Sequence, residues 1–341
     1  MRFKDKVAFL SEPGAYPWPV DAVETVETHT AMVFLAGDRA LKLKKPVRFG
    51  VIDFSSLERR GHFCREELRL NRQLAGHVYR DVRPLVRAPD GGLRLDGAGH
   101  VVDWLVEMTR LPADQFLDLR LAAGGVAEAE IEAVMTLLAA FYRARRAEAA
   151  EGLAEAGGPG AYCDHLLQEC ETNAAHLDAM AAHLGPDYRP EIAATATKLM
   201  QRHRDEIEAR GRAGLIVEGH GDLRPEHVCL VSPPVIFDRL EFYPPMRRVD
   251  IYDEVNYLGL ECAMMGGDWI WPRVLELLER AHGNPPSVAL LDAYGAFRAL
   301  TRARLSIDHL RDPKPRSPQK WPTQARRYIA VAARLLQPFL S

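Results

Sequence analysis

The sequence predicts an α+β fold with two lobes, a small β-rich N-terminal lobe with one helix and a larger, mainly α-helical C-terminal lobe. The chain has 341 residues, more than one hydrophobic core usually serves. Strand-like runs dominate up to residue 108, whereas Ala-, Leu- and Glu-rich segments of helical period dominate from residue 112 onward. We therefore expect a β-rich N-terminal lobe at 1–108 and a helical C-terminal lobe at 109–341.

The first lobe begins its regular structure with "TAMVFLAGDRALKLKKPV" (30–47), which predicts a β-hairpin. Two apolar runs flank the dipeptide Gly37-Asp38, and such a dipeptide favours a tight hairpin turn. The other elements expected in this lobe are a helix over 54–76, capped by Ser55 or Ser56, and further strands over 82–108.

Helices separated by polar loops are expected in the second lobe. They are predicted at 126–150, about 160–184, about 190–210, about 250–265, 270–282, 287–312 and 322–338, with loops at 151–160 and 311–322. Between the third and fourth of these helices lie two strand-like stretches, "LIVEGHGD" and "HVCLVSPPVIFDRLEF". The second contains Ser232-Pro233-Pro234, which predicts a short hairpin inside the helical lobe.

The composition is that of an ordinary globular protein, with 47% hydrophobic and 27% charged residues and a formal net charge of -3. This charge gives no general attraction to nucleic acid or to an anionic membrane. No apolar run approaches the ~20 residues that span a bilayer, and the N-terminus does not resemble a secretory signal. Five cysteines without a C-x-x-C pair suit a reducing compartment. We expect a cytoplasmic protein without a nucleic-acid or membrane partner.

Polar residues crowd the stretch "VEGHGDLRPEHVCL" (217–230), directly before a β-run. Asp222 lies in this loop, and Asp238 ends the run "PVIFD" sixteen residues later. The hairpin would bring the two carboxylates side by side, which costs energy unless a divalent cation or a substrate hydroxyl comes between them. The alternative is structural: Asp222 caps a turn, and Asp238 pairs with Arg239 or Arg247.

These motifs carry a resemblance. "HGDLRPEH" resembles the catalytic loop H-R-D-L-x-x-x-N of protein kinases and, more closely, the loop H-G-D-x-x-x-x-N of aminoglycoside phosphotransferases and choline kinases. "VIFDRLEF" resembles the metal-binding I-D-x-E strand of that second group, and "FCREELRLNRQLA" and "MTRLP" resemble an uncharacterised bacterial branch of the aminoglycoside phosphotransferase family. The resemblance implies a bilobal protein-kinase-like fold and transfer of the γ-phosphate of ATP to a hydroxyl of a small molecule.

The resemblance also implies roles for residues of the loop and the strand. Asp222 is the expected base that accepts the proton of the substrate hydroxyl, and Arg224 is expected to meet the transferred phosphate. Asp238 is expected to bind Mg²⁺ that bridges the nucleotide phosphates. His220 is expected to hold the loop by packing and hydrogen bonding rather than to react.

The nucleotide side of the site is expected in the first lobe. Lys42 and Lys44 share one face of a strand, and "RALK" is similar to the kinase pattern V-A-I-K, which favours Lys42 for the α- and β-phosphates with Lys44 in reserve. Glu67 lies on the inward stripe of the helix and needs a cation there, so we predict that it pairs with Lys42. Glu107 and Met108, in "WLVEMTRLP", are candidates for binding adenine through their backbone, although a strand that enters a helix needs no such role.

Two further groups have an open interpretation. Asp250, near the start of a helix, is the candidate that steadies the catalytic loop, as an Asp does in the phosphotransferase family. Arg298, Arg302 and Arg304 lie on roughly one side of a helix. A solvated basic face is the favoured explanation, and an acceptor site for an anionic substrate is the alternative.

The sequence departs from the family pattern at His227, which stands where an Asn usually binds the second metal ion. Imidazole is disfavoured by Mg²⁺ and better tolerated by Mn²⁺. A catalytically weak, nucleotide-binding pseudokinase or regulatory module is therefore the alternative function. No G-x-G-x-x-G covers the phosphates, where Thr28, His29 and Thr30 could donate instead, and no G-K dipeptide of a P-loop occurs.

A third interpretation is a metal-dependent hydrolase. Its single ion would be held by His220, Asp222, His227 and Asp238. It leaves Lys42 and Glu67 without a role, so we disfavour it.

Overall fold

The computed structural model describes residues 1–152, 158, 160–185, 188–312, 315 and 317–340. The contacts divide the chain into two compact units. The N-terminal unit comprises Met1–Arg120 and Glu226–Met246, and the C-terminal unit comprises Leu121–Pro225 and Arg247–Ser341. The sequence analysis assigned residues 226–246 to the helical lobe, whereas their contacts group them with the N-terminal unit. The predicted loops at 151–160 and 311–322 lie partly outside the described residues.

A six-stranded antiparallel sheet forms the centre of the N-terminal unit, in the order β1-β2-β3-β8-β6-β7. Its strands are β1 (Val23–Glu27), β2 (Ala31–Ala36), β3 (Arg39–Lys44), β6 (Tyr79–Arg87), β7 (Leu93–Leu95) and β8 (His100–Thr109). The predicted hairpin is confirmed as β2 and β3, which turn at Gly37 with a φ of 64°. The strands expected over 82–108 are also confirmed. The sequence analysis did not predict β1.

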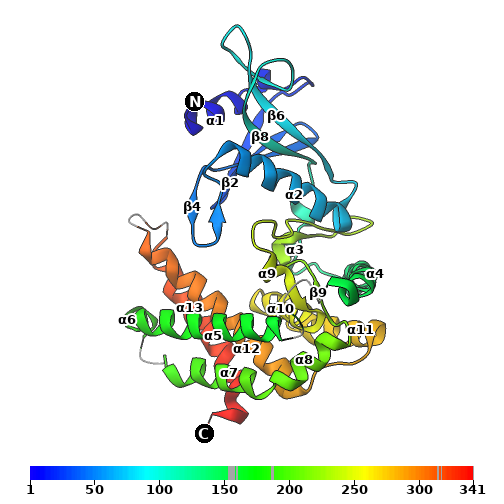
Figure 1. Ribbon diagram of the computed structural model, residues 1–341, viewed down its shortest axis with the longest axis vertical. Coiled ribbons are helices and arrows are strands. Elements are labelled where there is room, and N and C mark those ends of the chain that lie inside the picture. The colour runs from blue at the N-terminus through cyan, green and yellow to red at the C-terminus, as the bar shows by residue number, and fades with distance from the viewer. Residues whose placement is uncertain (153–157, 159, 186–187, 313–314, 316, 341) are drawn as a thin grey trace. The chain divides into compact units, whose positions relative to one another are not determined.

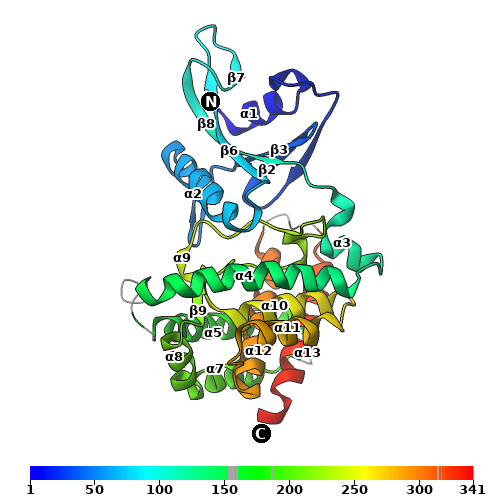
Figure 2. The same cartoon turned by 90° about the vertical axis from the view of Figure 1, so that its right-hand side faces the viewer.

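Two helices cover opposite faces of this sheet (Figure 2). Helix α1 (Phe3–Leu10), which was not predicted, packs on the face that carries Leu41 and Leu43. Helix α2 (Leu57–Ala75) packs on the face that carries Ala40 and crosses β6 and β8 (Figure 1). Because strand side chains alternate, Lys42 and Lys44 also lie on the α2 face.

Helix α2 begins and ends almost where the sequence predicts. The Ser56 side chain accepts a hydrogen bond from the Arg59 N–H at 3.2 Å, which caps the first turn. Its buried stripe includes Cys64, Glu67 and Leu70. An acid thus enters the interior of the unit on the face that meets the two lysines.

The predicted Pro-containing hairpin is confirmed as β10 (Val228–Cys229) and β11 (Val235–Ile236), with a cis bond between Ser232 and Pro233. It packs in the N-terminal unit, where the Leu230 N–H donates to the Gln115 carbonyl at 2.8 Å. A separate two-stranded ribbon consists of β4 (Arg48–Phe49) and β5 (Ile52–Asp53).

Helices make up most of the C-terminal unit, and the predicted helical regions are present in the part of the chain that the structure describes. They are α4 (Glu128–Gly152), α5 (Ala161–Ala179), α6 (Ala181–Leu184), α7 (Pro190–Arg202), α8 (Arg204–Arg212), α10 (Ile251–Met264), α11 (Ile270–His282), α12 (Val288–Asp308) and α13 (Lys320–Leu336), while α3 (Leu117–Ala122) and α9 (Pro244–Arg247) lie at the unit boundaries. Helices α5, α7, α12 and α13 share one core. No helix among the described residues is long and apolar enough to span a membrane.

The strand before the loop that carries Asp222 is β9 (Ile216–Glu218), and it pairs with β12 (Arg248–Asp250). The register joins Val217 to Val249 and Asp250 to Ile216. Since α10 follows β12 directly, this ribbon places the loop after β9 beside the first turns of α10.

Candidate active site

The predicted ion pair between Lys42 and Glu67 is present in the N-terminal unit. Lys42 Nζ lies 2.9 Å from Glu67 Oε1, and the Glu67 side chain is fully buried. Lys42 Nζ also lies 2.5 Å from Asp238 Oδ1. One ammonium group therefore joins strand β3, helix α2 and the residue that follows β11.

Lys44 holds the other oxygen of the same glutamate. Its Nζ lies 2.5 Å from Glu67 Oε2, and it also pairs with Glu241. The ammonium lies 5.0 Å from the centre of the Phe54 ring. The sequence analysis did not identify Glu241 as part of the site. Its signal was present in "VIFDRLEF", where a second acid follows Asp238 by three residues.

The charges of this cluster shift the pKa values of its members. Burial lowers the pKa of Lys42, but Asp238 and Glu67 raise it further, so the pKa ends well above its ordinary value. Burial raises the pKa of Asp238, but Lys42 and His227 outweigh burial and hold it well below the usual range. Burial raises the pKa of Glu241. Lys42 and Asp238 are therefore both charged at neutral pH.

The backbone of Asp238 is in the left-handed region, with a φ of 62°. This conformation is uncommon for a residue with a side chain. Its N–H donates to the Tyr79 hydroxyl at 3.2 Å, and the next N–H, of Arg239, donates to Asn71 Oδ1 at 2.8 Å. Side chains from β6 and α2 thus hold the chain where it leaves β11.

The donor set around Asp238 bears on metal binding. His227 Nε2 lies 3.8 Å from Asp238 Oδ2. Within the described ranges no three His, Cys, Asp or Glu side chains gather closely enough to hold an ion by themselves. Mg²⁺ in nucleotide sites takes one or two protein carboxylates and otherwise phosphate and water oxygens. An ionised Asp238 fits that requirement, and the imidazole of His227 suits Mn²⁺ better than Mg²⁺.

Glu107 and Met108 lie inside the ladder of β8, between β3 and β6. The Glu107 carboxylate is buried and accepts from Arg39 at 2.6 Å and from Arg83 at 2.5 Å. The chain leaves the sheet after Arg110, whose N–H donates to the Asp38 carbonyl. Binding of adenine by Glu107 and Met108 stays a prediction.

In the C-terminal unit, Asp222 is held by two neighbours. Its N–H donates to His220 Nδ1 at 3.3 Å, and the Tyr257 hydroxyl donates to Asp222 Oδ1 at 3.3 Å. His220 is fully buried, as expected for a residue that holds the loop. Burial raises the pKa of Tyr257 well above its ordinary value, so its hydroxyl stays protonated and remains a donor. The approach of Asp222 and Asp238 stays a prediction.

Glu254 on α10 is the carboxylate that holds the loop backbone. Its Oε1 accepts the Gly221 N–H at 2.7 Å, and its Oε2 accepts the Tyr142 hydroxyl at 2.7 Å. A Cβ added at Gly219 would lie 2.5 Å from Glu254 Oε2, so glycine is required for this approach. Burial raises the pKa of Glu254, and the loop N–H groups oppose that effect.

The sequence analysis assigned this steadying role to Asp250, and the contacts of Asp250 show that the assignment was wrong. Asp250 caps α10 by accepting the Tyr252 N–H at 2.9 Å, and it pairs with Arg210. Its side chain is fully buried among these partners. Glu254, one turn further along α10, faces the loop instead.

The three arginines of α12 are not a solvated basic face. Their side chains are 12%, 14% and 20% exposed for Arg298, Arg302 and Arg304 in turn. Each lies against an acid on a neighbouring helix, and Arg298 makes two hydrogen bonds with Asp253, at 2.9 and 2.6 Å. Packing of α12 against α5 and α10 therefore buries the side that the sequence analysis expected to face water.

Arg224 lies beside one of these acids. Its Nε is 3.5 Å from Glu261 Oε2, and Arg302 Nε is 3.5 Å from Glu261 Oε1. The Tyr328 hydroxyl donates to Glu261 Oε2 at 3.0 Å. The sequence analysis missed Tyr257 and Glu261; their spacing of four residues on α10, which puts both on one face, was the available signal.

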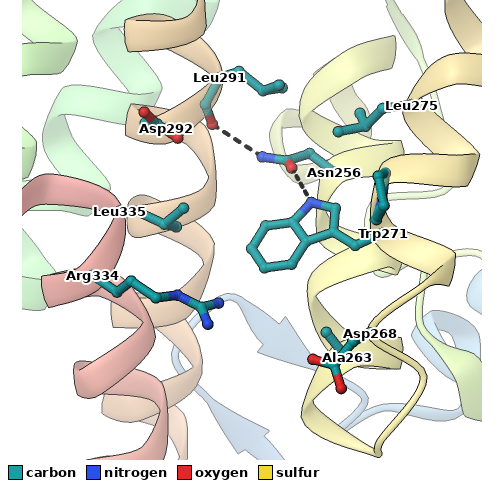
Figure 3. A pocket seen from close by; sticks show the side chains of 10 residues that line it. Asn256, Ala263, Asp268, Trp271, Leu275, Leu291, Asp292, Arg334 and Leu335 are labelled. Atoms are coloured by element: carbon teal, nitrogen blue, oxygen red, sulfur yellow. Dashed lines mark hydrogen bonds between the residues drawn. The ribbon is translucent and has the colours of Figure 1, made fainter.

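A pocket of about 350 Å³ opens elsewhere in the C-terminal unit, between α10, α11, α12 and α13 (Figure 3). Asn256 and Trp271 line it, but the Trp271 Nε1–H donates to Asn256 Oδ1 at 2.6 Å and the Asn256 Nδ2–H donates to the Leu291 carbonyl at 3.1 Å (Figure 3). Neither Asp222 nor Arg224 lines this pocket. It is therefore distinct from the cluster around Asp222.

No protein-family profile matches the chain. Among curated proteins, it is similar to uncharacterised proteins of Mycobacterium tuberculosis strain H37Rv and Mycobacterium bovis, each 29% identical over 317 residues. The match covers 92% of this chain and 60% of each relative. The chain thus spans about 60% of the length of these relatives.

Two solved structures show the same fold. A choline/ethanolamine kinase family protein from Mesorhizobium loti matches with a TM-score of 0.52 and 14% identity, covering 98% of this chain and 94% of the other. A thermostable mutant of an aminoglycoside phosphotransferase matches with a TM-score of 0.52 and 14% identity, covering 92% and 96%. The predicted α+β, protein-kinase-like fold is confirmed.

Proposed function

We propose that this protein is an ATP-dependent phosphotransferase that moves the γ-phosphate to a hydroxyl of a small molecule. The observation that carries the proposal is the Lys42 ammonium, which contacts a buried glutamate of α2 and Asp238 at once. Phosphoryl transfer on the protein-kinase fold requires a lysine–glutamate ion pair and an aspartate that holds Mg²⁺, and these three residue types lie together here. The names of the two solved proteins, for choline/ethanolamine and for aminoglycosides, support a small-molecule acceptor.

The residues of the N-terminal unit supply charge. Lys42, fixed by Glu67, presents an ammonium to the α- and β-phosphates, and Lys44 is the reserve for that role. Asp238 holds Mg²⁺, or Mn²⁺ with the help of His227, and the bound ion supplies positive charge on the nucleotide phosphates. Because Asp238 is ionised well below neutral pH, it needs no proton loss before it binds the ion.

The residues of the C-terminal unit position the acceptor. Asp222 accepts the proton as the acceptor oxygen forms its bond to the γ-phosphorus and the bond to the ADP oxygen breaks. The Tyr257 hydroxyl orients Asp222, and Glu254 fixes the backbone of the loop. The Arg224 guanidinium stabilises negative charge on the transferred group. A protein that consumes ATP in this way belongs in the cytoplasm, in line with its cysteine content.

A nucleotide-binding pseudokinase is the second candidate, and the position of His227 is the observation that favours it. Its imidazole lies 3.8 Å from Asp238, where an oxygen ligand would serve a second Mg²⁺ better. Nucleotide binding measured with Mg²⁺ and with Mn²⁺, beside ATP consumption, separates the two functions. A pseudokinase binds nucleotide with either ion and consumes none.

The proposal is tested by screening hydroxylated metabolites for acceptor-dependent formation of ADP. Asp222→Asn is the blank, and Asp205→Asn, an exposed aspartate of α8, is the matched control. We expect at least one acceptor to raise ADP formation in the wild type and the control but not in the blank. If the blank consumes ATP as fast as the wild type, Asp222 is not the catalytic carboxylate.

A further inference from the structure

Two guanidinium groups share one carboxylate beside Asp222, all within the C-terminal unit. Arg224 from the catalytic loop and Arg302 from α12 each place Nε 3.5 Å from an oxygen of Glu261. The Tyr328 hydroxyl on α13 donates to the same carboxylate. Glu261 and Asp222 both act on the charge of Arg302, so this arginine lies between a buried carboxylate and the carboxylate of the loop. We call Arg224, Arg302, Glu261 and Tyr328 the arginine cluster.

The arginine cluster and the catalytic carboxylate lie on the same side of α10. Tyr257 donates to Asp222, and Glu261, four residues later on α10, lies between the two arginines. Residues four apart on a helix are neighbours on one face. A small molecule whose hydroxyl reaches Asp222 therefore has the arginine cluster as its nearest charged surface on that face.

The accessible part of the cluster is positive. The Glu261 side chain is only 1% exposed, whereas those of Arg224 and Arg302 are 15% and 14% exposed. A cationic ligand would have to displace both guanidinium groups to reach the carboxylate. An anionic ligand can reach the Arg302 guanidinium directly.

Arg302 also retains hydrogen-bonding capacity, unlike its neighbour on α12. Its Nε is buried and has no hydrogen-bond acceptor among the described residues, as is also true of Arg304 Nε, whereas Arg298 makes two hydrogen bonds with Asp253. Buried donors without acceptors are rare in proteins. A planar fork of donors of this kind matches a carboxylate or a phosphate group.

We propose that the acceptor is a small hydroxyl compound that also carries a carboxylate or phosphate group, and that Arg302 binds this anion while the hydroxyl meets Asp222. The inference rests on the proposed phosphotransferase function. It assigns Arg302 as the residue that sets the charge of the acceptor. It also gives Glu261 the role of holding the two guanidinium groups together in the absence of the acceptor.

The test uses four probes that share the same vicinal hydroxyl groups and differ in charge: glycerol, glycerate, glycerol 3-phosphate and 3-amino-1,2-propanediol. Calorimetry of the whole chain measures binding of each probe, and ADP formation measures transfer. We expect glycerate or glycerol 3-phosphate to bind at least about tenfold more tightly than glycerol and the amine. If glycerol or the amine binds as tightly as both anions, or if neither anion binds, the inference is wrong.

Variants assign the anion to Arg302. Arg302→Lys keeps the charge but loses the fork, and the double variant Arg302→Gln with Glu261→Gln removes both charges of the pair, so that Glu261 does not stay charged after losing Arg302. We expect both to weaken binding of the preferred anion by about 10- to 100-fold. Arg304→Gln, on the same helix but paired with Glu169, is the control and should bind as the wild type does. Unchanged anion binding in the double variant contradicts the inference.

The two readouts separate this inference from the proposed function. Binding that selects anions through Arg302, without ADP formation from any probe or metabolite, supports the anion site and contradicts phosphoryl transfer. Transfer to neutral or cationic acceptors, blocked by Asp222→Asn and unaffected by the double variant, supports the function and contradicts the anion site.

Discussion

Glu67 is a single buried carboxylate that serves two ammonium groups, one on each oxygen. Removing one partner of such a group leaves an uncompensated buried charge. We expect Lys44→Met to lower the free energy of unfolding by about 3–5 kcal/mol, because the variant removes one ammonium group from the buried carboxylates of Glu67 and Glu241. Urea-induced unfolding measures the change.

Lys45, the next residue, provides the matched control. It pairs with Glu27, which is 43% exposed, and pairs of that kind contribute about 0–1 kcal/mol. Lys45→Met should therefore change the free energy of unfolding by no more than about 1 kcal/mol. Equal losses in the two variants would mean that the buried cluster does not stabilise the N-terminal unit.

The contact between Lys42 and Asp238 should appear in the pH dependence of stability. Because the folded pKa of Asp238 is depressed, its contribution is present above the unfolded value of about 4 and is lost as the pH falls through the folded value. The difference in free energy of unfolding between the wild type and Asp238→Asn should therefore be constant from about pH 5 to 8. It should shrink as the pH falls below about 4.

Asparagine is the suitable substitute at position 238, because it tolerates the left-handed backbone that Asp238 adopts. Urea-induced unfolding of both proteins across this pH range gives the difference. A difference that grows as the pH falls would show that Asp238 is destabilised in the folded protein, against the direction of its pKa shift.

At this scale, the sequence could predict the pair of Lys42 and Glu67. Strand alternation and helical spacing both point these side chains to the same interior. Glu241 and Tyr79 could not be found in that way, because nothing local specifies which residues of α2, β3 and β6 meet the chain after β11. Their contacts depend on long-range packing.

At the scale of elements, the loop that carries Asp222 depends on Gly219, whose lack of a side chain lets Glu254 approach the loop. An added Cβ would lie 2.5 Å from Glu254 Oε2 and 2.5 Å from Val249 Cγ2. We expect Gly219→Ala to cost about 1–3 kcal/mol, as overpacking of a buried site does, and to lower transfer by displacing Asp222. Urea-induced unfolding and ADP formation measure the two effects.

Gly14→Ala is the control that measures the effect of replacing a glycine where the added Cβ makes no close contact. An added Cβ there meets no atom within 4 Å, so Gly14→Ala should change stability by no more than about 0.5 kcal/mol. If Gly219→Ala is as stable and as active as Gly14→Ala, the close approach of Glu254 does not hold the loop.

Elements were predictable where their pattern is local. The β2–β3 hairpin and the capped helix α2 follow from turn residues and from a helical stripe. The environment of α12 could not be predicted from the sequence. Its arginines could face either water or acids on α5 and α10, and the helical spacing is the same in both cases. The assignment of the loop-steadying role to Asp250 failed for a similar reason, since Glu254 also lies near the start of α10.

For the whole molecule, the sequence predicted the fold class but not the membership of the second β-hairpin. Residues 226–246 interrupt the helical part of the chain, yet they pack with the sheet of the N-terminal unit. Asp222 and Asp238 consequently belong to different units, although they are only sixteen residues apart in the sequence. The proposed function gives them separate tasks, transfer for Asp222 and metal-dependent nucleotide binding for Asp238.

The separate roles of Asp222 and Asp238 are tested most directly by two measurements on the wild type, Asp238→Asn and Asp222→Asn. The first is the affinity for ATP with and without Mg²⁺, and the second is the rate of phosphate transfer. We predict that Asp238→Asn loses the Mg²⁺-dependent part of the affinity. We predict that Asp222→Asn keeps the affinity and loses transfer by about 100- to 10,000-fold. Mg²⁺-dependent affinity in Asp238→Asn equal to that of the wild type, with transfer intact in Asp222→Asn, would contradict the account.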